Sequence, residues 1–421
     1  MTERTTVVVI GAGHSGLAMS RRLAERSIDH VVLERGEVAN SWATERWQSL
    51  RLLTPTWQTT LPGSEPQWED PDGYLTTAEL VDYLRRYASD IAAPVQTQTT
   101  VTRVSGVPGN YLVETNRGDW IAEAVVVASG GSNLPVIPKV FESLADGVQA
   151  ITPFDYQSPE SLPEGGVLVV GASATGVQLA KEIAESGRQV VLSTGEHVRM
   201  PRVYRGKDIF WWMDRVGVLD ERYDQMDDII RARHVPSPQL VGAPDGRSVD
   251  LNALQEVGVE IVGRLGRMRD GLAQFSGGLA NTARLADLKQ ERLLDRFDAW
   301  AEASGVTDLG PIERPEDTVV SEHPRLDLDL AKEGFSTVLW ATGFAPDYSW
   351  LDLPVLDYKG KIKHDGGVVT ASPGLYVLGT SLLRRRRSTY ISGAAQDTED
   401  LAEHLVGYLA HGIVRDEALA S

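Results

Sequence analysis

Apolar residues occur in short continuous runs along this chain, and two of these runs end in the same kind of turn. Residues 6–10 (TVVVI) lead into Gly11-Ala12-Gly13-His14-Ser15-Gly16, and residues 167–170 (VLVV) lead into Gly171-Ala172-Ser173-Ala174-Thr175-Gly176. Continuous β-branched runs bounded by glycine are typical of strands that are buried on both faces. Each segment therefore predicts a buried strand, a tight turn and the start of a helix.

Further apolar runs predict the other core strands, at residues 31–33, 125–128, 190–192, 338–341 and 375–378. Apolar residues near helical spacing predict an amphipathic helix at 283–303 and a second helix at 394–411. Prolines and glycines between 152 and 166 predict a linker. The pattern indicates an α/β protein with two Rossmann-like dinucleotide-binding domains, the second inserted into the first. Residues 1–160 and 335–421 form the first domain, and residues 161–334 form the second with a helical insertion.

The glycine turns have the spacing of sites that hold a dinucleotide pyrophosphate. The first glycine permits the turn, the second lets the backbone approach the phosphates, and the third lets the helix pack on the strand. The N-terminus of the helix then faces the anion. Glu34 follows the second strand of the first unit, where a carboxylate accepts hydrogen bonds from a ribose. This favours FAD in the first site.

The second site differs at the position that contacts the ribose. Thr194 stands where an acid would be expected, and Arg199, Arg202 and Arg205 follow it. A carboxylate would repel a 2′-phosphate, whereas guanidinium groups bind one. The second site is therefore interpreted as an NADPH site, and two nucleotides in one chain suggest electron transfer between them.

Charge and composition exclude several other functions. The formal net charge of −18 argues against nucleic acid as a partner. The chain has no cysteine, which excludes a redox-active dithiol, and its histidines lack metal-ligand spacing, so no metal is expected. Neither a signal peptide nor a membrane span is predicted, so we expect a cytoplasmic protein. The expected partners are a small-molecule substrate and O2, and a homodimer is left open.

At these motifs the chain resembles the class B flavoprotein monooxygenases, in particular their bacterial flavin-containing monooxygenase-like branch. The resemblance rests on the two glycine turns and on residues 31–34, 41–42, 124–131, 340–344 and 375–380. It implies an FAD domain, a smaller NADPH domain and a substrate cleft between them. In this family NADPH reduces FAD, and the reduced flavin traps O2 as a C4a-hydroperoxide that oxygenates nitrogen, sulfur or a carbonyl carbon.

The chain departs from the family pattern at three threonines. Thr152 stands in place of a histidine, Thr54 in place of an asparagine beside the flavin, and Thr380 in place of an aspartate. Thr54 is the candidate catalytic residue, as a hydrogen-bond donor to the flavin peroxide. Because of these departures, an NADPH-dependent oxidase or reductase without oxygen insertion stays open as the alternative. A flavin-binding sensor is a third hypothesis, although the second nucleotide site argues against it.

Other residues are candidates for contact with the cofactors or substrate. Four tryptophans, Trp42, Trp47, Trp57 and Trp68, would form planar walls that exclude water. Arg46 and the run Arg384–Arg387 are either solvated or bind an anion. The predicted cofactor-binding residues are Gly11, Gly13, His14, Ser15, Gly16, Glu34, Arg35, Ser41, Trp42, Gly130, Gly171, Ser173, Ala174, Thr175, Gly176, Thr194, Arg199, Arg202, Arg205, Ala341, Thr342, Gly343 and Gly379.

Overall fold

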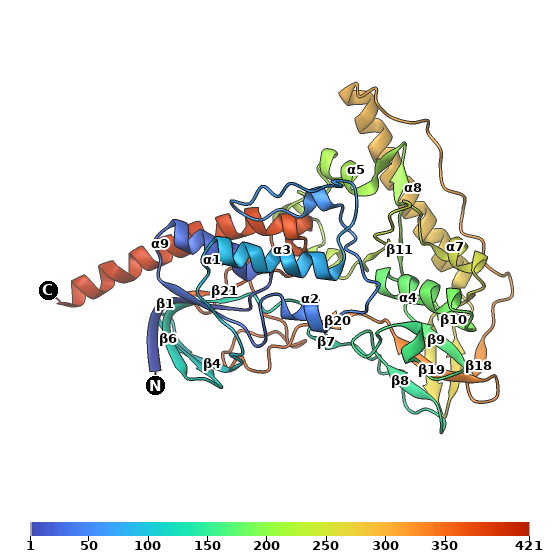
Figure 1. Ribbon diagram of the computed structural model, residues 1–421, viewed down its shortest axis with the longest axis horizontal. Coiled ribbons are helices and arrows are strands. Elements are labelled where there is room, and N and C mark those ends of the chain that lie inside the picture. Colours follow the sequence, from blue (N-terminus) through green and yellow to red (C-terminus); the bar gives the residue numbers. More distant parts are fainter. Residues whose placement is uncertain (1, 421) are drawn as a thin grey trace.

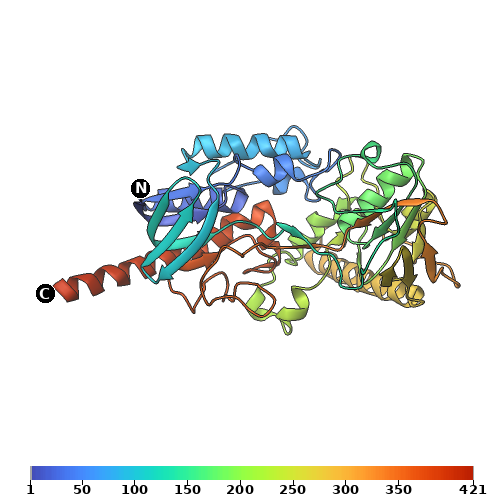
Figure 2. The same cartoon turned by 90° about the horizontal axis from the view of Figure 1, so that it is seen from below.

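Two lobes lie side by side along the long axis of the molecule, each built on a sheet of mainly parallel strands (Figures 1 and 2). The computed structural model describes residues 2–420, and side chains as far as residue 411. It confirms the predicted α/β class.

The first lobe contains a seven-stranded sheet in the order β3-β2-β1-β6-β5-β4, with β21 also paired to β6. β1 runs parallel to β2 and β6, whereas β4, β5 and β6 form an antiparallel meander. Residues 119–123 of β6 alternate between less and more buried positions, and residues 124–127 are all buried. This change matches the step from antiparallel to parallel neighbours. The strands are β1 (Thr2–Ile10), β2 (His30–Leu33), β3 (Val95–Gln96), β4 (Val101–Val107), β5 (Asn110–Thr115), β6 (Asp119–Val127) and β21 (Leu375–Val377).

Helices α1 (His14–Glu25), α3 (Thr77–Asp90) and α9 (Ala394–Ala420) pack together in this lobe, and α9 extends beyond it (Figure 1). A capping box starts α3, in which Thr76 Oγ1 accepts a 3.2 Å hydrogen bond from the Glu79 N–H and Glu79 accepts one from Thr76 N–H. The short helix α2 (Asn40–Thr44) contacts α3 and lies beside the first glycine turn.

The second lobe contains a parallel five-stranded sheet in the order β15-β10-β9-β19-β8. Helix α4 (Ala174–Glu185) follows β9 directly, just as α1 follows β1, and α7 (Leu251–Glu256) packs on α4. All five residues of β9 are buried, as the apolar run predicted. The strands are β8 (Gln149–Ile151), β9 (Gly166–Val170), β10 (Val190–Ser193), β15 (Glu260–Val262) and β19 (Phe335–Trp340).

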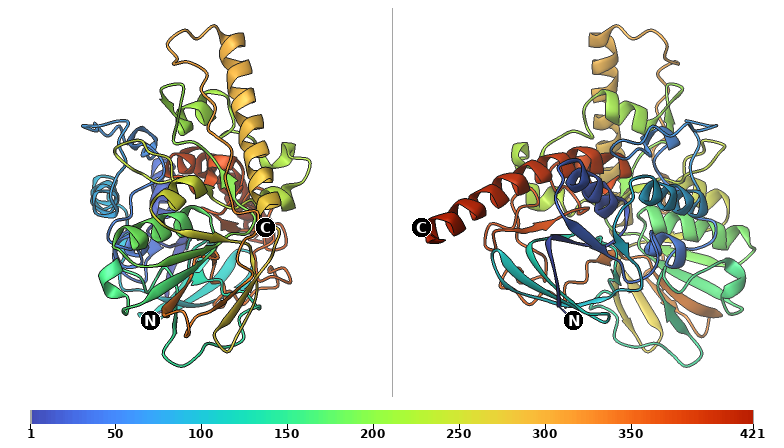
Figure 3. Two further views of the ribbon diagram at one scale, coloured as in Figure 1. Left: turned by 90° about the vertical axis from the view of Figure 1, so that its right-hand side faces the viewer. Right: turned by 60° about the vertical axis from the view of Figure 1, so that its left-hand side comes forward.

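Smaller elements surround this sheet, and the long helix α8 (Leu279–Ser304) projects from it (Figure 3). The predicted helix at 283–303 is therefore confirmed and begins four residues earlier. The remaining helices are α5 (Ile209–Arg215) and α6 (Ile229–Ala232). The remaining strands are β11 (Val198–Arg199), β12 (Val203–Tyr204), β13 (Lys207–Asp208), β14 (Pro238–Gln239), β16 (Leu265–Arg269), β17 (Leu272–Phe275) and β18 (Asp327–Asp329).

The chain crosses between the lobes twice, and the two crossings run antiparallel beside each other. β7 (Leu134–Pro135) leaves the first lobe and β20 (Phe344–Ala345) returns to it. β21 pairs with β6, so the chain returns to the first sheet after it has formed the second. The strands of the second sheet therefore lie between β6 and β21 along the sequence. β8 (Gln149–Ile151) and β19 (Phe335–Trp340) pair in the second sheet, although the predicted limits at residues 160 and 335 assign both segments to the first domain.

The arginine run predicted to be solvated or anion-binding joins the two lobes. Arg386 pairs with Glu221 at 2.6 Å, and Arg387 pairs with Asp214 at 2.7 Å and with Asp220 at 2.8 Å. These acids lie on or directly after α5 of the second lobe. The backbone N–H groups of Arg386 and Arg387 also donate to carbonyl oxygens of that segment. Arg384 and Arg385 pair instead with Asp400 and Asp397 on α9 of the first lobe, so the run is anchored in one lobe and contacts the other.

Candidate functional site

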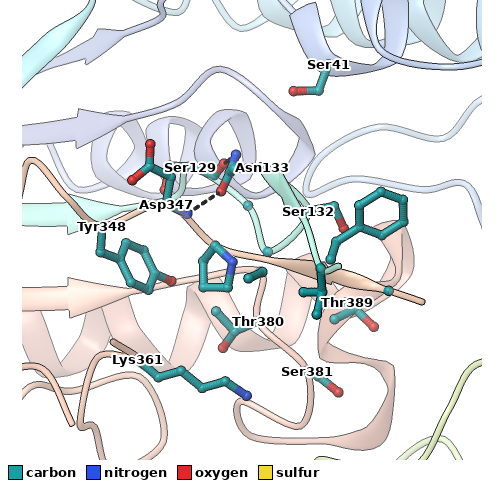
Figure 4. A pocket seen from close by; sticks show the side chains of 18 of the residues that line it. Ser41, Ser129, Ser132, Asn133, Asp347, Tyr348, Lys361, Thr380, Ser381 and Thr389 are labelled. Carbon is teal, nitrogen blue, oxygen red and sulfur yellow. Dashed lines mark hydrogen bonds between the residues drawn. The ribbon is translucent and has the colours of Figure 1, made fainter. Parts of the chain in front are cut away.

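Both glycine turns line one cleft between the lobes, which has a volume of about 1790 Å³. Sites for a single drug-sized ligand are usually ~300–1,000 Å³. The wall includes Gly11, Gly13 and Ser15 from the first turn and Gly171 and Thr175 from the second. The cleft is large enough for two dinucleotides, and the turns bring them to a common space. Figure 4 shows the polar side chains that project into it.

Close backbone contacts explain the spacing of the first turn. A Cβ atom on Gly11, whose φ is +108°, would lie 2.6 Å from the Ala128 carbonyl oxygen. A Cβ on Gly16 would lie 1.9 Å from the Gly11 carbonyl oxygen. Around Gly13, by contrast, a Cβ would meet no described heavy atom within 4 Å. Gly11 and Gly16 therefore pack the helix on the strands, and Gly13 leaves room on the cleft side.

The second turn repeats this arrangement. A Cβ on Gly171 would lie 2.4 Å from the Ala341 carbonyl oxygen, and one on Gly176 would lie 1.8 Å from the Gly171 carbonyl oxygen. Ser173, in place of the middle glycine, is the N-cap residue of α4 and lines the cleft. Ala341, Thr342 and Gly343 line it as predicted, whereas Ala174 is buried behind the wall.

Two helix N-termini therefore face the cleft without internal caps. Neither Gly13 at α1 nor Ser173 at α4 supplies a side-chain cap, and neither helix has an acid in its first turn. Helices leave their first N–H groups without internal partners, and those groups bind anions well. The arrangement fits one pyrophosphate at each turn.

Glu34 is held at the cleft wall by two backbone groups. It is 7 % exposed, and its carboxylate accepts hydrogen bonds from Ala12 N–H at 2.8 Å and from Gly36 N–H at 3.1 Å. Each carboxylate oxygen keeps a further lone pair for a ribose hydroxyl. Arg35 pairs with Glu45 and donates to Ser41, and both Arg35 and Ser41 line the same part of the cleft.

Four buried polar atoms in the cleft wall have no partner among the described residues: Arg233 Nε in the segment after α6, and His14 Nε2, Ser129 Oγ and Thr380 Oγ1 in the first lobe. Buried polar atoms are nearly always hydrogen-bonded, so unpaired ones at a cleft point to a ligand. Burial lowers the pKa of His14 to about 4, which keeps the imidazole neutral at pH 7. Gly130 and Gly379 lie beside these atoms with φ of +82° and +70°. This polar wall fits the hydroxyl-rich ribityl and phosphate parts of FAD.

The three arginines predicted to bind a 2′-phosphate do not line the described cleft. Arg199 donates to Asp250 and Asp287, and Arg205 donates to Asp298. Arg202 is fully buried and donates to Asp208 and to the Leu53 carbonyl oxygen. We correct the prediction accordingly, because ion pairs inside the second lobe already occupy these guanidinium groups.

Arg264 is the arginine that the structure brings to this part of the cleft. It is exposed, lines the cleft directly after β15, and forms no ion pair with the described residues. Its side chain lies beside Gly195, which lines the cleft together with Ser193. Thr194, between them, is buried and does not belong to the described wall. The parallel pairing of β10 and β15 brings Arg264 here, a long-range contact that the sequence pattern did not indicate.

Thr54 is buried, at 8 % exposure, and does not belong to the cleft wall among the described residues. Its segment is held at the contact between the lobes, since a Cβ on Gly242 would lie 2.2 Å from the Leu52 carbonyl oxygen. The structure thus gives no support to Thr54 as a donor at the flavin.

Of the four predicted aromatic walls, Trp42 lines the cleft and Trp47, Trp57 and Trp68 pack in hydrophobic cores. Arg46 lines the cleft with Trp42, and its guanidinium carbon lies 5.3 Å from the Trp42 ring centroid. Burial lowers the pKa of Arg46, which pairs with no described carboxylate. Its guanidinium carbon also lies 6.0 Å from the ring centroid of Phe154, which packs on Phe344 of β20, so Arg46 lies near the crossing strands and can meet an anion there.

The described residues contain no cluster of three potential metal ligands. Across the same residues, no helix combines the length and apolar character that a bilayer crossing requires.

Comparison with known proteins shows the family of this chain. Residues 8–207 match the family described as pyridine nucleotide-disulphide oxidoreductase. A CzcO-like oxidoreductase of Geobacillus kaustophilus is 32 % identical over 411 residues, covering 97 % of this chain and 100 % of the relative. The chain belongs to the CzcO-like oxidoreductases.

Solved structures support the fold of this oxidoreductase. A flavin-containing monooxygenase from Stenotrophomonas maltophilia superposes with a TM-score of 0.67 at 21 % identity, covering 97 % of this chain and 99 % of the other. A complex of OTEMO with FAD and NADP superposes with a TM-score of 0.56 at 16 % identity, covering 98 % of this chain and 87 % of the other. The fold expected from the resemblance to flavoprotein monooxygenases is confirmed.

Gly16→Ala and Gly13→Ala should separate folding from FAD binding. Gly16→Ala forces backbone apart and should lower the free energy of unfolding by about 3 kcal/mol. Gly13→Ala places a methyl group in open cleft space, so the apoprotein should keep its melting temperature while FAD binds at least about tenfold more weakly. Thermal melts and FAD titration measure the two effects. Full FAD affinity in Gly13→Ala would contradict the assignment of the first turn.

Arg199→Gln should destabilise the protein without changing its choice of nicotinamide cofactor. Removing one partner of a buried ion pair costs about 3–5 kcal/mol, because Asp250 and Asp287 lose their counter-charge. Urea denaturation measures the loss, and Arg103→Gln, which breaks an exposed pair with Asp352, is the control. A selective rise in the KM for NADPH at unchanged stability would restore the predicted role of Arg199.

Proposed function

We propose that this oxidoreductase is an FAD-dependent, NADPH-consuming monooxygenase. It inserts one oxygen atom from O2 into a small-molecule substrate, by N- or S-oxidation or by a Baeyer–Villiger reaction, and reduces the other to water. The observation that carries the proposal is the single cleft reached by both glycine turns. Two separate sites would suit two independent ligands, whereas one continuous space lets two bound nucleotides meet.

The residues of the first lobe would bind and orient FAD. The uncapped N-terminus of α1 holds the pyrophosphate, and Glu34 accepts the ribose hydroxyls. His14, Ser129 and Thr380 present their unpaired polar atoms to the remaining hydroxyl and carbonyl groups. Bound FAD supplies the two-electron chemistry and the activation of O2, and the protein positions it and limits water.

The residues of the second lobe would bind NADPH. The N-terminus of α4 and Ser173 hold its pyrophosphate, and Arg264 beside Gly195 takes the 2′-phosphate in place of the arginines first considered. Glu196 also lines this end of the cleft, but its charge is compensated by Lys289 at 2.9 Å. Arg46 and Trp42 stand near the crossing strands, where they can orient the groups that meet between the lobes.

An oxidase or reductase without oxygen insertion is the second candidate, and the position of Thr54 favours it. A hydrogen-bond donor protects an oxygen species from early loss, and Thr54, the predicted donor, lies outside the described wall. Thr380, whose Oγ1 atom is unpaired at the cleft, is the alternative donor in this chain.

Arg264→Gln should raise the KM for NADPH about tenfold or more and leave the KM for NADH within twofold, since a charge-assisted contact contributes about 1.5–3 kcal/mol. Steady-state NAD(P)H oxidation measures both constants. Arg269→Gln, an exposed arginine outside the described cleft wall, is the matched control. Equal effects of Arg264→Gln on the two cofactors would remove Arg264 from the 2′-phosphate site.

The fate of oxygen separates the two candidate functions. With a panel that contains a tertiary amine, an aryl sulfide and a cyclic ketone under 18O2, at least one product should carry one 18O atom. NADPH consumed, O2 consumed and product formed should then stand in equal amounts. If every NADPH oxidised yields one hydrogen peroxide across the panel, the oxidase is correct. Thr380→Val should shift the balance from product to peroxide.

A further inference from the structure

One part of the cleft rim is strongly basic, although the chain as a whole carries a net charge of −18. Lys359, Lys361 and Lys363 all line the cleft. They are three of only eight lysines in the sequence. Lys361 lies in the same pocket as Thr380 and Ser381 (Figure 4). The average composition does not predict three lysines in one short segment of the cleft wall, so a local function should account for them.

A tight hairpin presents these lysines on one side. Leu356 bridges to Ile362, and Asp357 accepts hydrogen bonds from the N–H groups of Lys359 at 2.8 Å and Lys361 at 2.9 Å. Ile362 is buried in the core of the first lobe. Successive side chains of an extended segment point to opposite faces, so burial of Ile362 directs both Lys361 and Lys363 outward. Both side chains are accordingly exposed, and both line the cleft.

The hairpin lysines have no acidic partner in the described structure. Neither Lys359, Lys361 nor Lys363 forms an ion pair with a described residue, although four other lysines do. Those four are Lys181, Lys207, Lys289 and Lys332. Two acids of this rim, Asp347 and Asp357, instead accept backbone N–H groups of their own turns. The positive charge here is therefore available to a ligand.

The segment after α6 adds Arg233 to the cations that line the cleft. Arg233 donates to the Leu382 carbonyl oxygen at 3.1 Å, pairs with no described carboxylate and keeps its buried Nε without a partner. His364 lies close enough to feel the charge of Arg233, and its Nδ1 accepts the Gly367 N–H at 3.1 Å. The neutral ring therefore carries its proton on Nε2 and can donate it in a hydrogen bond.

Apolar side chains flank Arg233 in the sequence. Ile230 and Val235, on either side of Arg233, line the cleft and are 70 % and 51 % exposed. A cleft wall that carries both exposed aliphatic side chains and unpaired cations suits a ligand with an apolar body and a negative end.

We propose that the substrate of this cleft is a small organic acid, whose carboxylate is bound by Lys361, Lys363 and Arg233 and whose apolar part contacts Ile230 and Val235. The proposal rests on the proposed monooxygenase function and adds the substrate class. NADPH and FAD are also anions, but their phosphates have separate sites at the two glycine turns and near Arg264. The test therefore has to distinguish a substrate carboxylate from a cofactor phosphate.

Two probes that carry the same methylthio group but differ in charge allow this distinction. The holoenzyme is titrated calorimetrically with para-(methylthio)benzoate and with para-(methylthio)benzamide. Wild type should bind the carboxylate at least about fivefold more tightly than the amide, and 0.5 M salt should reduce that preference. Lys361→Gln/Lys363→Gln should lose the preference. Lys139→Gln removes the same kind of charge from an exposed lysine outside the described wall, and it should keep the preference.

Cofactor measurements on the same variants complete the test. The double variant should retain full FAD occupancy and a KM for NADPH within twofold of wild type. Loss of FAD or a selective rise in that KM, with the carboxylate preference intact, would overturn the proposal and assign the lysines to a cofactor phosphate. Equal binding of both probes by wild type would also overturn it. Tight carboxylate binding without oxygen transfer would instead count against the monooxygenase alone.

Discussion

The close contact between a helix and two strand ends at each glycine turn is the constraint on which the rest of this protein depends. At the first turn, the Gly11 carbonyl oxygen occupies the space of a Gly16 Cβ, and the Ala128 carbonyl oxygen occupies that of a Gly11 Cβ. This contact fixes the start of α1 over the ends of β1 and β6. The unpaired N–H groups of the helix then have a defined direction, toward the cleft. The anion site is thus a consequence of packing.

The same contact recurs at Gly171, Gly176 and Ala341, and this repetition explains why one cleft serves both turns. Each sheet directs the carboxyl ends of its parallel strands toward its helix N-terminus. The antiparallel crossings β7 and β20 hold the two sheets with these ends facing a common space. Neither lobe alone encloses the volume, so the substrate region belongs to the junction and not to a single domain.

Short sequence motifs predicted those parts of the site that are formed by residues close together in the sequence. The turns, Glu34 and the strands that lead into them depend on neighbours within one unit. The roles of Arg199 and Arg205 could not be predicted in the same way, because their partners Asp250, Asp287 and Asp298 lie far along the chain. An arginine cluster has the same appearance in sequence whether it binds a ligand or neutralises buried acids.

Thr54 illustrates a second limit of prediction from sequence. Its alignment with a residue beside the flavin depends on a loop whose path is fixed by contact with Gly242 in the other lobe. The basic hairpin was missed for a related reason. Alternating lysines usually indicate a solvated edge, and only the tertiary structure places this hairpin at the cleft.

The arginine run at 384–387 has a consequence for how the two nucleotide sites influence each other. It binds the second lobe through Arg386 and Arg387, while the residues just before it, Thr380 and Ser381, line the cleft in the first lobe. A rotation of the second lobe must therefore displace the cleft wall of the first. If a ligand at one site alters the angle between the lobes, it changes the affinity of the other site for its own ligand. The second ligand must then change the affinity of the first site by the same factor, so the arginine run would couple the two binding equilibria.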